Sequence, residues 1–258
     1  MKLSIITINY NNREGLQKTL DSVFGQSCKD FEYIVIDGNS NDGSKELILQ
    51  NTDQINYWVS ESDKGIYNAM NKGIRAAQGE YLLFLNSGDK LVEDVVAMIM
   101  QRLHTYDIIY GDWYQVFSEN HIQRENFPDL ITFNFLAFKY SLPHQSSFIK
   151  RDILLKHGLY DESLRMVSDW KFFLDAIFKF NCTYKHLDLP ISYYDKNGFS
   201  SNTDNHDFQQ KERCRVIDEG YSNFKYSEEE QNSVFTRLSH FENSRIIKTL
   251  RKMNILRF

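Results

Sequence analysis

The feature that most limits the fold of this chain is a regular alternation of two patterns over its first hundred residues. Short runs rich in β-branched and aromatic residues alternate with segments whose apolar residues recur at helical spacing. The first helical stripe, for example, consists of Leu16, Leu20, Val23 and Phe24. We expect strands at residues 3–8, 31–36, 57–59 and 81–85, each followed by a helix, such as those over 44–50 and 66–77.

This alternation of strands and helices is typical of a mostly parallel sheet that helices cover on both faces. In such sheets the carboxyl ends of the strands meet at one edge, and ligands bind there. The four expected strands lead into loops that carry Asn9, Asp37, Asp63 and Asp89. The sequence therefore predicts an α/β fold with a polar site at this edge of the sheet.

The second half of the chain is less regular. A helix beginning with Ser168 as its cap would bury an apolar face that includes Trp170. Further helices are expected at residues 129–138 and from Asp207 onward. The strands expected in this half are 107–110, 113–117, 145–149, 183–187 and 191–194.

Composition excludes several classes of protein. The 258 residues are 41% hydrophobic and 25% charged, which argues against disordered, collagen-like and coiled-coil chains. The net charge of −5 argues against a nucleic-acid partner. Three widely spaced cysteines fit neither a zinc site nor a disulfide framework. With no signal-peptide cleavage site and no apolar run near the ~18 residues of a membrane span, we expect a cytoplasmic protein.

Four motifs carry a resemblance to a known family. They read SIITINYN at residues 4–11, IDGNSNDGS at 36–44, DKGIYNAMNKG at 63–73 and FLNSGD at 84–89. In this order and spacing they resemble the opening strand, two donor loops and metal motif of the inverting glycosyltransferases of family 2. The resemblance is dense over residues 3–89 and weaker to about residue 195. It implies the GT-A fold, which is Rossmann-like, with a mostly parallel central sheet flanked by helices.

The resemblance also implies a division of the chain. Residues 1–205 would form the catalytic domain, with a donor half over about 1–110 and an acceptor half over about 111–205. Residues 206–258 would be a helical C-terminal extension. Its end, residues 244–258, interleaves five basic residues with apolar ones and contains no acid. Such a tail can make peripheral contact with an anionic membrane face through residues 245–258, or it can pack on the domain with a solvated basic face.

By this resemblance, the loops of the first half would bind a nucleotide-sugar donor. Asp37 and Asp63 would accept hydrogen bonds from the base or ribose, since a carboxylate is a strong acceptor. The alternative for Asp37 is a turn-capping role. The expected donor-binding residues are Thr7, Asn9, Tyr10, Asp37, Ser40, Asp63, Lys64, Gly65, Asn86 and Ser87.

The resemblance further implies a weakly held Mn²⁺ or Mg²⁺ at the donor diphosphate. The family carries acidic residues in its metal motif, but this chain has Asn86 and Gly88 at two of those positions and retains Asp89. One carboxylate and the diphosphate oxygens can still hold a mostly hydrated ion. The alternative is a β-turn in which Asp89 caps the following helix.

The acceptor side is implied by weaker matches. Asp169, in the sequence Ser-Asp-Trp, matches the acid that removes the proton from the acceptor hydroxyl, although an acid also favours a helix N-terminus without any catalytic role. Expected acceptor-binding residues are His144, Gln145, Asp112 and Trp170. For His144 and Trp170, a structural role is the alternative.

These expectations favour transfer of a single sugar from a nucleotide-diphosphate sugar, with a UDP-sugar as the expected donor, to a hydroxyl of a glycan or lipid-linked oligosaccharide in cell-surface polysaccharide biosynthesis. Processive relatives carry Gln-x-x-Arg-Trp, and the matching residues Gln210–Cys214 lack the Trp. A non-catalytic nucleotide-sugar-binding protein is the alternative that Asn86 and Gly88 suggest. A sugar nucleotidyltransferase is disfavoured, because no Gly-rich phosphate loop follows the first strand.

Overall fold

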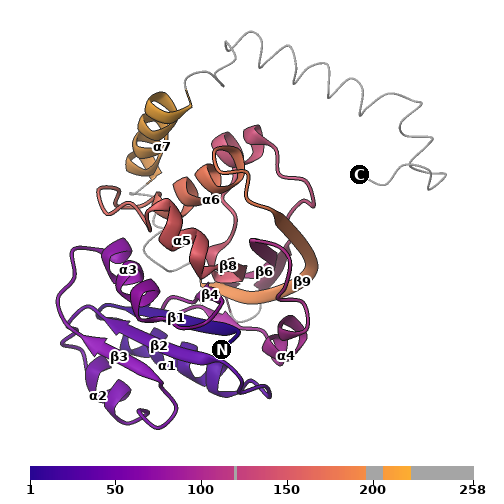
Figure 1. Cartoon of the computed structure of the whole chain (residues 1–258). Coiled ribbons are helices and arrows are strands. Elements are labelled where there is room, and N and C mark those ends of the chain that lie inside the picture. Colours follow the sequence, from indigo (N-terminus) through magenta and orange to yellow (C-terminus); the bar gives the residue numbers. More distant parts are fainter. Residues whose placement is uncertain (119–120, 196–205, 222–258) are drawn as a thin grey trace. The chain divides into compact units, whose positions relative to one another are not determined.

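The computed structural model describes residues 1–118, 121–195 and 206–221 (Figure 1). The chain divides into two compact units, Met1–Arg213 and Cys214–Phe258. All expected site residues lie in the first unit. The predicted basic tail over residues 244–258 lies outside the described residues.

Four parallel strands form the first half of a mixed sheet, in the order β3-β2-β1-β4. Every residue of β1, β2 and β4 is buried, because helices cover both faces of this part of the sheet. The parallel alternation predicted from the apolar runs is therefore confirmed. The strands are β1 (Leu3–Asn9), β2 (Glu32–Asp37), β3 (Tyr57–Ser60) and β4 (Tyr81–Phe84).

The sheet continues beyond β4 in the order β8-β6-β9-β5. Strand β8 is antiparallel to β4 and to β6, whereas β9 is parallel to β6. Strand β7 pairs with the outer part of β6, and β5 pairs with β9. The bounds are β5 (Lys90–Leu91), β6 (Ile108–Ser118), β7 (His121–Glu125), β8 (Ser147–Lys150) and β9 (Tyr184–Asp195).

Helices pack on both faces of the sheet (Figure 1). One face shares a core with α1, α2 and α4 through alternate strand residues such as Ile5 and Leu83. On the other face, Gly73 of α3 lies against Ile6, and Tyr160 lies against Phe84 with ring centroids 5.4 Å apart. The helices are α1 (Arg13–Phe24), α2 (Ser44–Leu49), α3 (Ile66–Ala76), α4 (Val95–Met100), α5 (Arg151–His157), α6 (Ser168–Phe178) and α7 (His206–Gly220).

The structure differs from the expectations mainly in the second half. Ser168 is the first residue of α6 rather than its cap, and its hydroxyl accepts a hydrogen bond from the backbone N–H of Asp161. The helix expected over 129–138 is reduced to a single π-helical turn, Phe135–Lys139. Residue Gln145 lies in a short 3₁₀ segment, His144–Ser146, that precedes β8. No helix of the described segments is long and apolar enough to cross a membrane.

Candidate functional site

Asp37, at the carboxyl end of β2, is the centre of a hydrogen-bond network at the edge of the sheet. Its Oδ1 accepts hydrogen bonds from Asn9 Nδ2 at 2.8 Å and from Ser40 Oγ at 2.6 Å. Its Oδ2 accepts from the backbone N–H of Ser40 at 3.0 Å and from Ser60 Oγ at 2.7 Å. The neighbouring strands β1, β2 and β3 each contribute a residue, because parallel strands end at the same edge.

The hydrogen bonds hold Asp37 as an anion. Burial, the largest single influence, raises the pKa of the carboxyl group, but the hydrogen bonds from Ser40, Ser60 and Asn9 together outweigh it and lower the pKa. The residue is fully buried, and its four acceptor positions are in use. A ligand would therefore contact Asp37 only if a serine hydroxyl turned away. Asp37 thus orders the loop that a ligand meets.

Tyr10 and Asp63 lie over Gly38, the residue that follows Asp37 in the chain. A methyl group added at Gly38 would come within 2.7 Å of Asp63 Oδ2 and 3.0 Å of the Tyr10 ring. The Tyr10 side chain is 67% exposed, and Asp63 is half-buried with Oδ1 bonded to the backbone N–H of Gly65. An exposed ring beside a partly open carboxylate can stack on a base and accept from a hydroxyl. Lys64 and Gly65, also expected here, are exposed in the same loop.

The turn Asn86–Asp89 follows β4 and is anchored to α1. Thr19 Oγ1 donates to the carbonyl of Asp89 at 2.7 Å and accepts from the N–H of Gly88 at 3.0 Å. The side chain of Asn12, the α1 cap, donates to the carbonyl of Ser87. These contacts place Ser87 beside the N-terminus of α1, where an anionic group is favoured, and Asp89 beside the middle of that helix.

The turn offers two protein oxygens to a divalent cation. Asp89 is 6% exposed, and Asn86 Oδ1 is buried without a hydrogen-bond partner among the described residues. No group of three or more His, Cys, Asp or Glu side chains in the described part of the chain is arranged to hold a metal. Mg²⁺ in phosphate-binding sites is commonly held by one or two protein oxygens together with substrate phosphates. The donor set therefore fits an ion that binds with the ligand.

His144 connects this turn to Asp169. Its Nε2 lies 3.2 Å from Asn86 Nδ2, and its Nδ1 lies 3.1 Å from Asp169 Oδ2. The other carboxylate oxygen, Oδ1, accepts a hydrogen bond of 2.7 Å from the hydroxyl of Tyr67. Three expected residues, Asn86, His144 and Asp169, are thus brought together with Tyr67, which was not predicted from the sequence.

The electrostatics of this group favour charge on Asp169. Burial, the largest influence, raises the pKa of Asp169, but the hydrogen bonds and charge of His144 and the hydroxyl of Tyr67 outweigh it, so the pKa is lowered. For His144, burial lowers the pKa, whereas Asp169 and the nearby charge of Asp89 raise it, and the net pKa is raised. Asp169 is therefore an anion at neutral pH, and it is suited to accept a proton from a hydroxyl group.

Three further expected site residues, Thr7, Trp170 and Gln145, are also closed off from solvent. Thr7 is fully buried, and its hydroxyl pairs with that of Tyr33. Trp170 is 1% exposed and donates from Nε1 to the carbonyl of Leu136, so it packs in the core. Gln145 is also 1% exposed, and neither polar atom of its side chain has a partner in the described structure. Thr7 and Trp170 therefore support the fold around the site.

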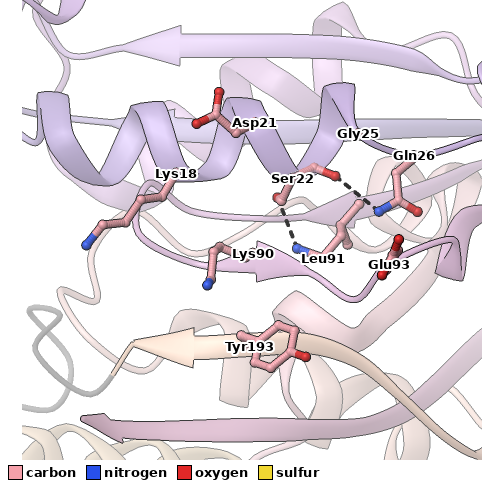
Figure 2. Close-up of a pocket in the computed structure, with 9 residues that line it drawn as sticks. All are labelled: Lys18, Asp21, Ser22, Gly25, Gln26, Lys90, Leu91, Glu93 and Tyr193. Atoms are coloured by element: carbon pink, nitrogen blue, oxygen red, sulfur yellow. Dashed lines mark hydrogen bonds between the residues drawn. The ribbon is translucent and has the colours of Figure 1, made fainter. Parts of the chain in front are cut away.

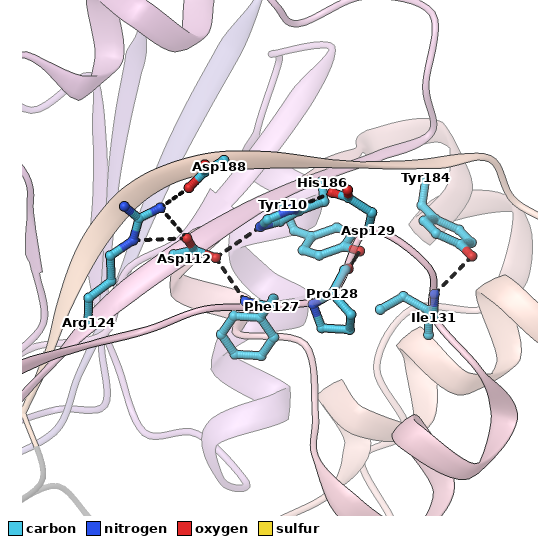
Figure 3. Close-up of polar contacts among 10 residues, drawn as sticks. All are labelled: Tyr110, Asp112, Arg124, Phe127, Pro128, Asp129, Ile131, Tyr184, His186 and Asp188. Carbon is cyan, nitrogen blue, oxygen red and sulfur yellow. Dashed lines mark hydrogen bonds and ion pairs between the residues drawn. The ribbon is translucent and has the colours of Figure 1, made fainter. Parts of the chain in front are cut away.

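Asp112, expected to contact an acceptor, is instead a buried member of a cluster of charged side chains (Figure 3). Its Oδ1 accepts from the N–H of Phe127 and faces His186 Nε2 at 2.9 Å, while Oδ2 binds Arg124. His186 Nδ1 in turn faces Asp129 at 2.8 Å. Because both oxygens are engaged and the residue is 0% exposed, Asp112 ties β6 to β7 and β9.

A separate groove opens between α1, β5 and β9 (Figure 2). It has a volume of about 500 Å³ and is lined by Lys18, Lys90, Glu93 and Tyr193 among others. The ammonium group of Lys90 lies 5.2 Å from the centre of the Tyr193 ring. None of the expected site residues is among those that line the groove.

Tyr67, Ser60 and Thr19 were not predicted from the sequence as residues of the site. Ser60 is the last residue of β3, so its place at the same edge as Asn9 and Asp37 could have been inferred from the parallel order. Tyr67 and Thr19 gave no such signal, because their partners lie 102 and 70 residues away in the chain.

Sequence comparison identifies the family. Residues 4–160 match the model of glycosyl transferase family 2. An uncharacterized glycosyltransferase of Mycobacterium tuberculosis is 36% identical over 179 residues, 67% of this chain and 68% of that protein. A PGL/p-HBAD biosynthesis glycosyltransferase of Mycobacterium bovis is 29% identical over 78% of this chain and 79% of that protein. A GalNAc(5)-diNAcBac-PP-undecaprenol β-1,3-glucosyltransferase of Campylobacter jejuni is 32% identical over 43% of this chain and 38% of that protein.

Solved structures share the fold. TarS residues 1–349 of S. aureus, in complex with UDP-GlcNAc, align with a TM-score of 0.66 at 22% identity over 95% of this chain and 74% of theirs. This chain spans 44% of the longer TarS structure. The mannosyltransferase PcManGT of Pyrobaculum calidifontis, in complex with GDP-Man and Mn²⁺, aligns at 0.54 and 16% identity over 73% of this chain and 55% of its own. Together with the family match, the GT-A architecture shows that this chain belongs to glycosyl transferase family 2 and is a glycosyltransferase.

Proposed function

We propose that this glycosyltransferase moves a single sugar, with inversion, from a nucleotide-diphosphate sugar to a hydroxyl group of a glycan or lipid-linked oligosaccharide. The observation that carries the proposal is the anionic Asp169, held by Tyr67 and His144 next to Asn86 of the turn after β4. A base beside a diphosphate-binding turn is the arrangement that one displacement at an anomeric carbon requires.

The donor would lie across the carboxyl edge of the parallel strands. Tyr10 and Asp63 would contact the base and ribose, with Lys64 and Gly65 near the phosphates and Asn9, Asp37 and Ser40 ordering the loop. A UDP-sugar is the simplest donor, because TarS, which shares the fold, is seen with UDP-GlcNAc. Ser87 and Asn86 would face the diphosphate and the donor sugar.

Asp89 and Asn86 Oδ1 would hold Mn²⁺ or Mg²⁺ together with the diphosphate, and the ion would neutralise charge on the leaving group. The acceptor hydroxyl attacks the anomeric carbon on the face opposite the diphosphate, and Asp169 takes its proton as the bond to the diphosphate breaks. His144 faces Asp169 and would contact the acceptor, whereas the side chain of Gln145 is buried next to it in the chain. The product linkage has the opposite anomeric configuration to the donor.

A lipid-linked acceptor is supported by the Campylobacter relative, whose name describes it as a glucosyltransferase of a PP-undecaprenol-linked glycan. Peripheral contact with a membrane through residues 245–258 stays a prediction, because the structure does not describe that segment.

The test is turnover with a panel of UDP-sugars and undecaprenyl-diphosphate-linked glycans, followed by NMR of the product linkage. We expect one UDP released for each sugar transferred, and inversion of the anomeric configuration. Asp169→Asn should lower kcat by roughly 10²–10⁴-fold and leave UDP affinity unchanged, since only the base is lost. Asp175→Asn is the matched control, because Asp175 lies on the same helix in an ion pair with Lys171.

Two results would contradict the proposal. Retention of configuration would exclude the single displacement, and full activity of Asp169→Asn would exclude Asp169 as the base. UDP binding without turnover on any donor would instead favour the non-catalytic binding protein suggested by Asn86 and Gly88.

A further inference from the structure

Tyr67 joins two parts of the molecule that are far apart in the sequence. It lies in the first turn of α3, two residues after Gly65 of the loop proposed to contact the donor. Its hydroxyl donates to Asp169 Oδ1 at 2.7 Å, across 102 residues of chain. The tyrosine is 5% exposed, so the hydrogen bond is shielded from water.

The groups around Asp169 have different roles. His144, from the 3₁₀ segment, faces the other carboxylate oxygen. Tyr160, between α5 and α6, lies near enough for the charge of Asp169 to add to the effect of burial in raising its pKa, yet its hydroxyl has no hydrogen-bond partner among the described residues. Arg213 of α7 stacks over Trp170, with its guanidinium carbon 5.0 Å from the ring centre. Burial lowers the pKa of Arg213, and the charge of Asp169 opposes this effect. Among the four, the direct hydrogen bonds come from Tyr67 and His144.

Tyr67 acts only as a donor. Burial is the main reason that its pKa lies well above the ordinary value, and the charge of Asp169 adds to it. The phenol therefore stays protonated in the working pH range. A carboxylate held at both oxygens cannot rotate freely about its Cβ–Cγ bond, so its remaining lone pairs keep a fixed direction.

We propose that Tyr67 is a positioning residue, whose hydroxyl fixes the orientation of the Asp169 carboxylate toward the acceptor hydroxyl. This inference rests on the proposed role of Asp169 as the base. It also means that one short segment, residues 63–67, would both contact the donor and orient the base.

The test compares Tyr67→Phe with Tyr160→Phe. Tyr160 is a matched control, because it is a buried tyrosine whose ring lies 5.8 Å from that of Tyr67 but whose hydroxyl makes no hydrogen bond in the described structure. We expect Tyr67→Phe to lower kcat by roughly tenfold, with the donor KM within about twofold, because positioning acts on the chemical step. Tyr160→Phe should change neither quantity by more than about twofold.

A second measurement needs no substrate. The ¹³C signal of the Asp169 carboxyl, identified by its loss in Asp169→Asn, reports the pKa of that group. Removing a donor to the charged form should raise this pKa by about one pH unit in Tyr67→Phe and leave it unchanged in Tyr160→Phe. An unmoved pKa and kcat in Tyr67→Phe, or equal effects of the two variants, would overturn the inference.

The outcomes separate the inference from the proposed function. If Asp169→Asn keeps full turnover, the base assignment fails whatever Tyr67→Phe does. If Asp169→Asn abolishes turnover and Tyr67→Phe behaves like Tyr160→Phe, only the inference about Tyr67 fails.

Discussion

Asp37 shows how a single residue can order a site without occupying it. Its negative charge is stabilised by four hydrogen bonds from Asn9, Ser40 and Ser60, and all of the donors are neutral groups. Since its acceptor positions are filled, the residues open to a ligand are its neighbours Tyr10 and Asp63. Their placement over Gly38 makes a small change at that glycine a direct test of the donor side.

We expect Gly38→Ala to weaken UDP binding by roughly tenfold with little loss of stability. The added methyl group would meet Asp63 Oδ2 and the Tyr10 ring, which are side-chain atoms that can move aside without disturbing the backbone. The movement displaces the two groups proposed to bind the donor. Calorimetric titration with UDP and thermal unfolding would measure the two effects. Unchanged UDP affinity would argue against Tyr10 and Asp63 as donor contacts.

At the scale of elements, β1 packs so closely against the turn before β4 that a side chain cannot be added at Gly79 of this turn without moving the strand. Gly79 donates from its N–H to Ser4 Oγ, and that hydroxyl donates to Glu32 at 2.6 Å. A methyl group at Gly79 would lie 2.5 Å from the backbone nitrogen of Ser4, which cannot move without shifting β1. The close approach therefore requires glycine.

We expect Gly79→Ala to destabilise the protein by about 1–3 kcal/mol, the usual cost of overpacking against backbone. Gly220→Ala is the control, because a methyl group there would meet no atom of the described residues within 4 Å. Denaturant unfolding should show a lower midpoint for the first variant and a midpoint close to wild type for the second. Equal midpoints for Gly79→Ala and wild type would refute the close approach.

The strands also show how much of the fold local sequence patterns can predict. Strands β1, β2 and β4 were predictable because each is a run of residues that is buried on both faces. Strand β6 was expected as two pieces separated at Gly111 and Asp112, but the structure has one strand whose pairing with β9 shifts at these residues. A methyl group at Gly111 would lie 2.5 Å from the carbonyl of Leu189, so this glycine allows close packing of two strands and does not mark a turn.

The site could likewise be predicted only in part from local sequence. Its loops are local motifs, whereas the contact of Tyr67 with Asp169 joins residues far apart in the chain and exists only in the folded protein.

The charge distribution of the whole molecule predicts how its stability responds to acid. Asp37, Asp107 and Asp169 have lowered pKa values, because hydrogen bonds to the charged forms outweigh the opposing effect of burial. A carboxyl group whose pKa is lower in the folded state than in the unfolded state, about 3.9 for Asp, stabilises the fold above that value. This stabilisation is lost as the pH falls through the lower pKa of the folded state.

We therefore expect the unfolding temperature to fall steeply below about pH 4. Asp37→Asn should melt at a lower temperature than wild type at pH 7, because the amide nitrogen cannot accept the hydrogen bonds of the carboxylate. The difference between the two proteins should narrow as the pH falls below about 3.9, the ordinary pKa of Asp, because the unfolded chain then binds a proton that the folded protein does not. Thermal unfolding at a series of pH values measures this, and a difference that stayed constant with pH would show that the charge of Asp37 is not involved.

The most direct test of the whole account is calorimetric titration of the wild-type protein with UDP, GDP and CMP, each with and without Mn²⁺. We expect UDP to bind in preference to GDP and CMP, and Mn²⁺ to tighten the binding of UDP through Asp89 and Asn86. Binding that is indifferent to Mn²⁺ would remove the ion from the site, and preference for GDP or CMP would change the donor. Failure of all three nucleotides to bind would contradict the central claim that the carboxyl edge of this sheet holds a nucleotide-sugar donor.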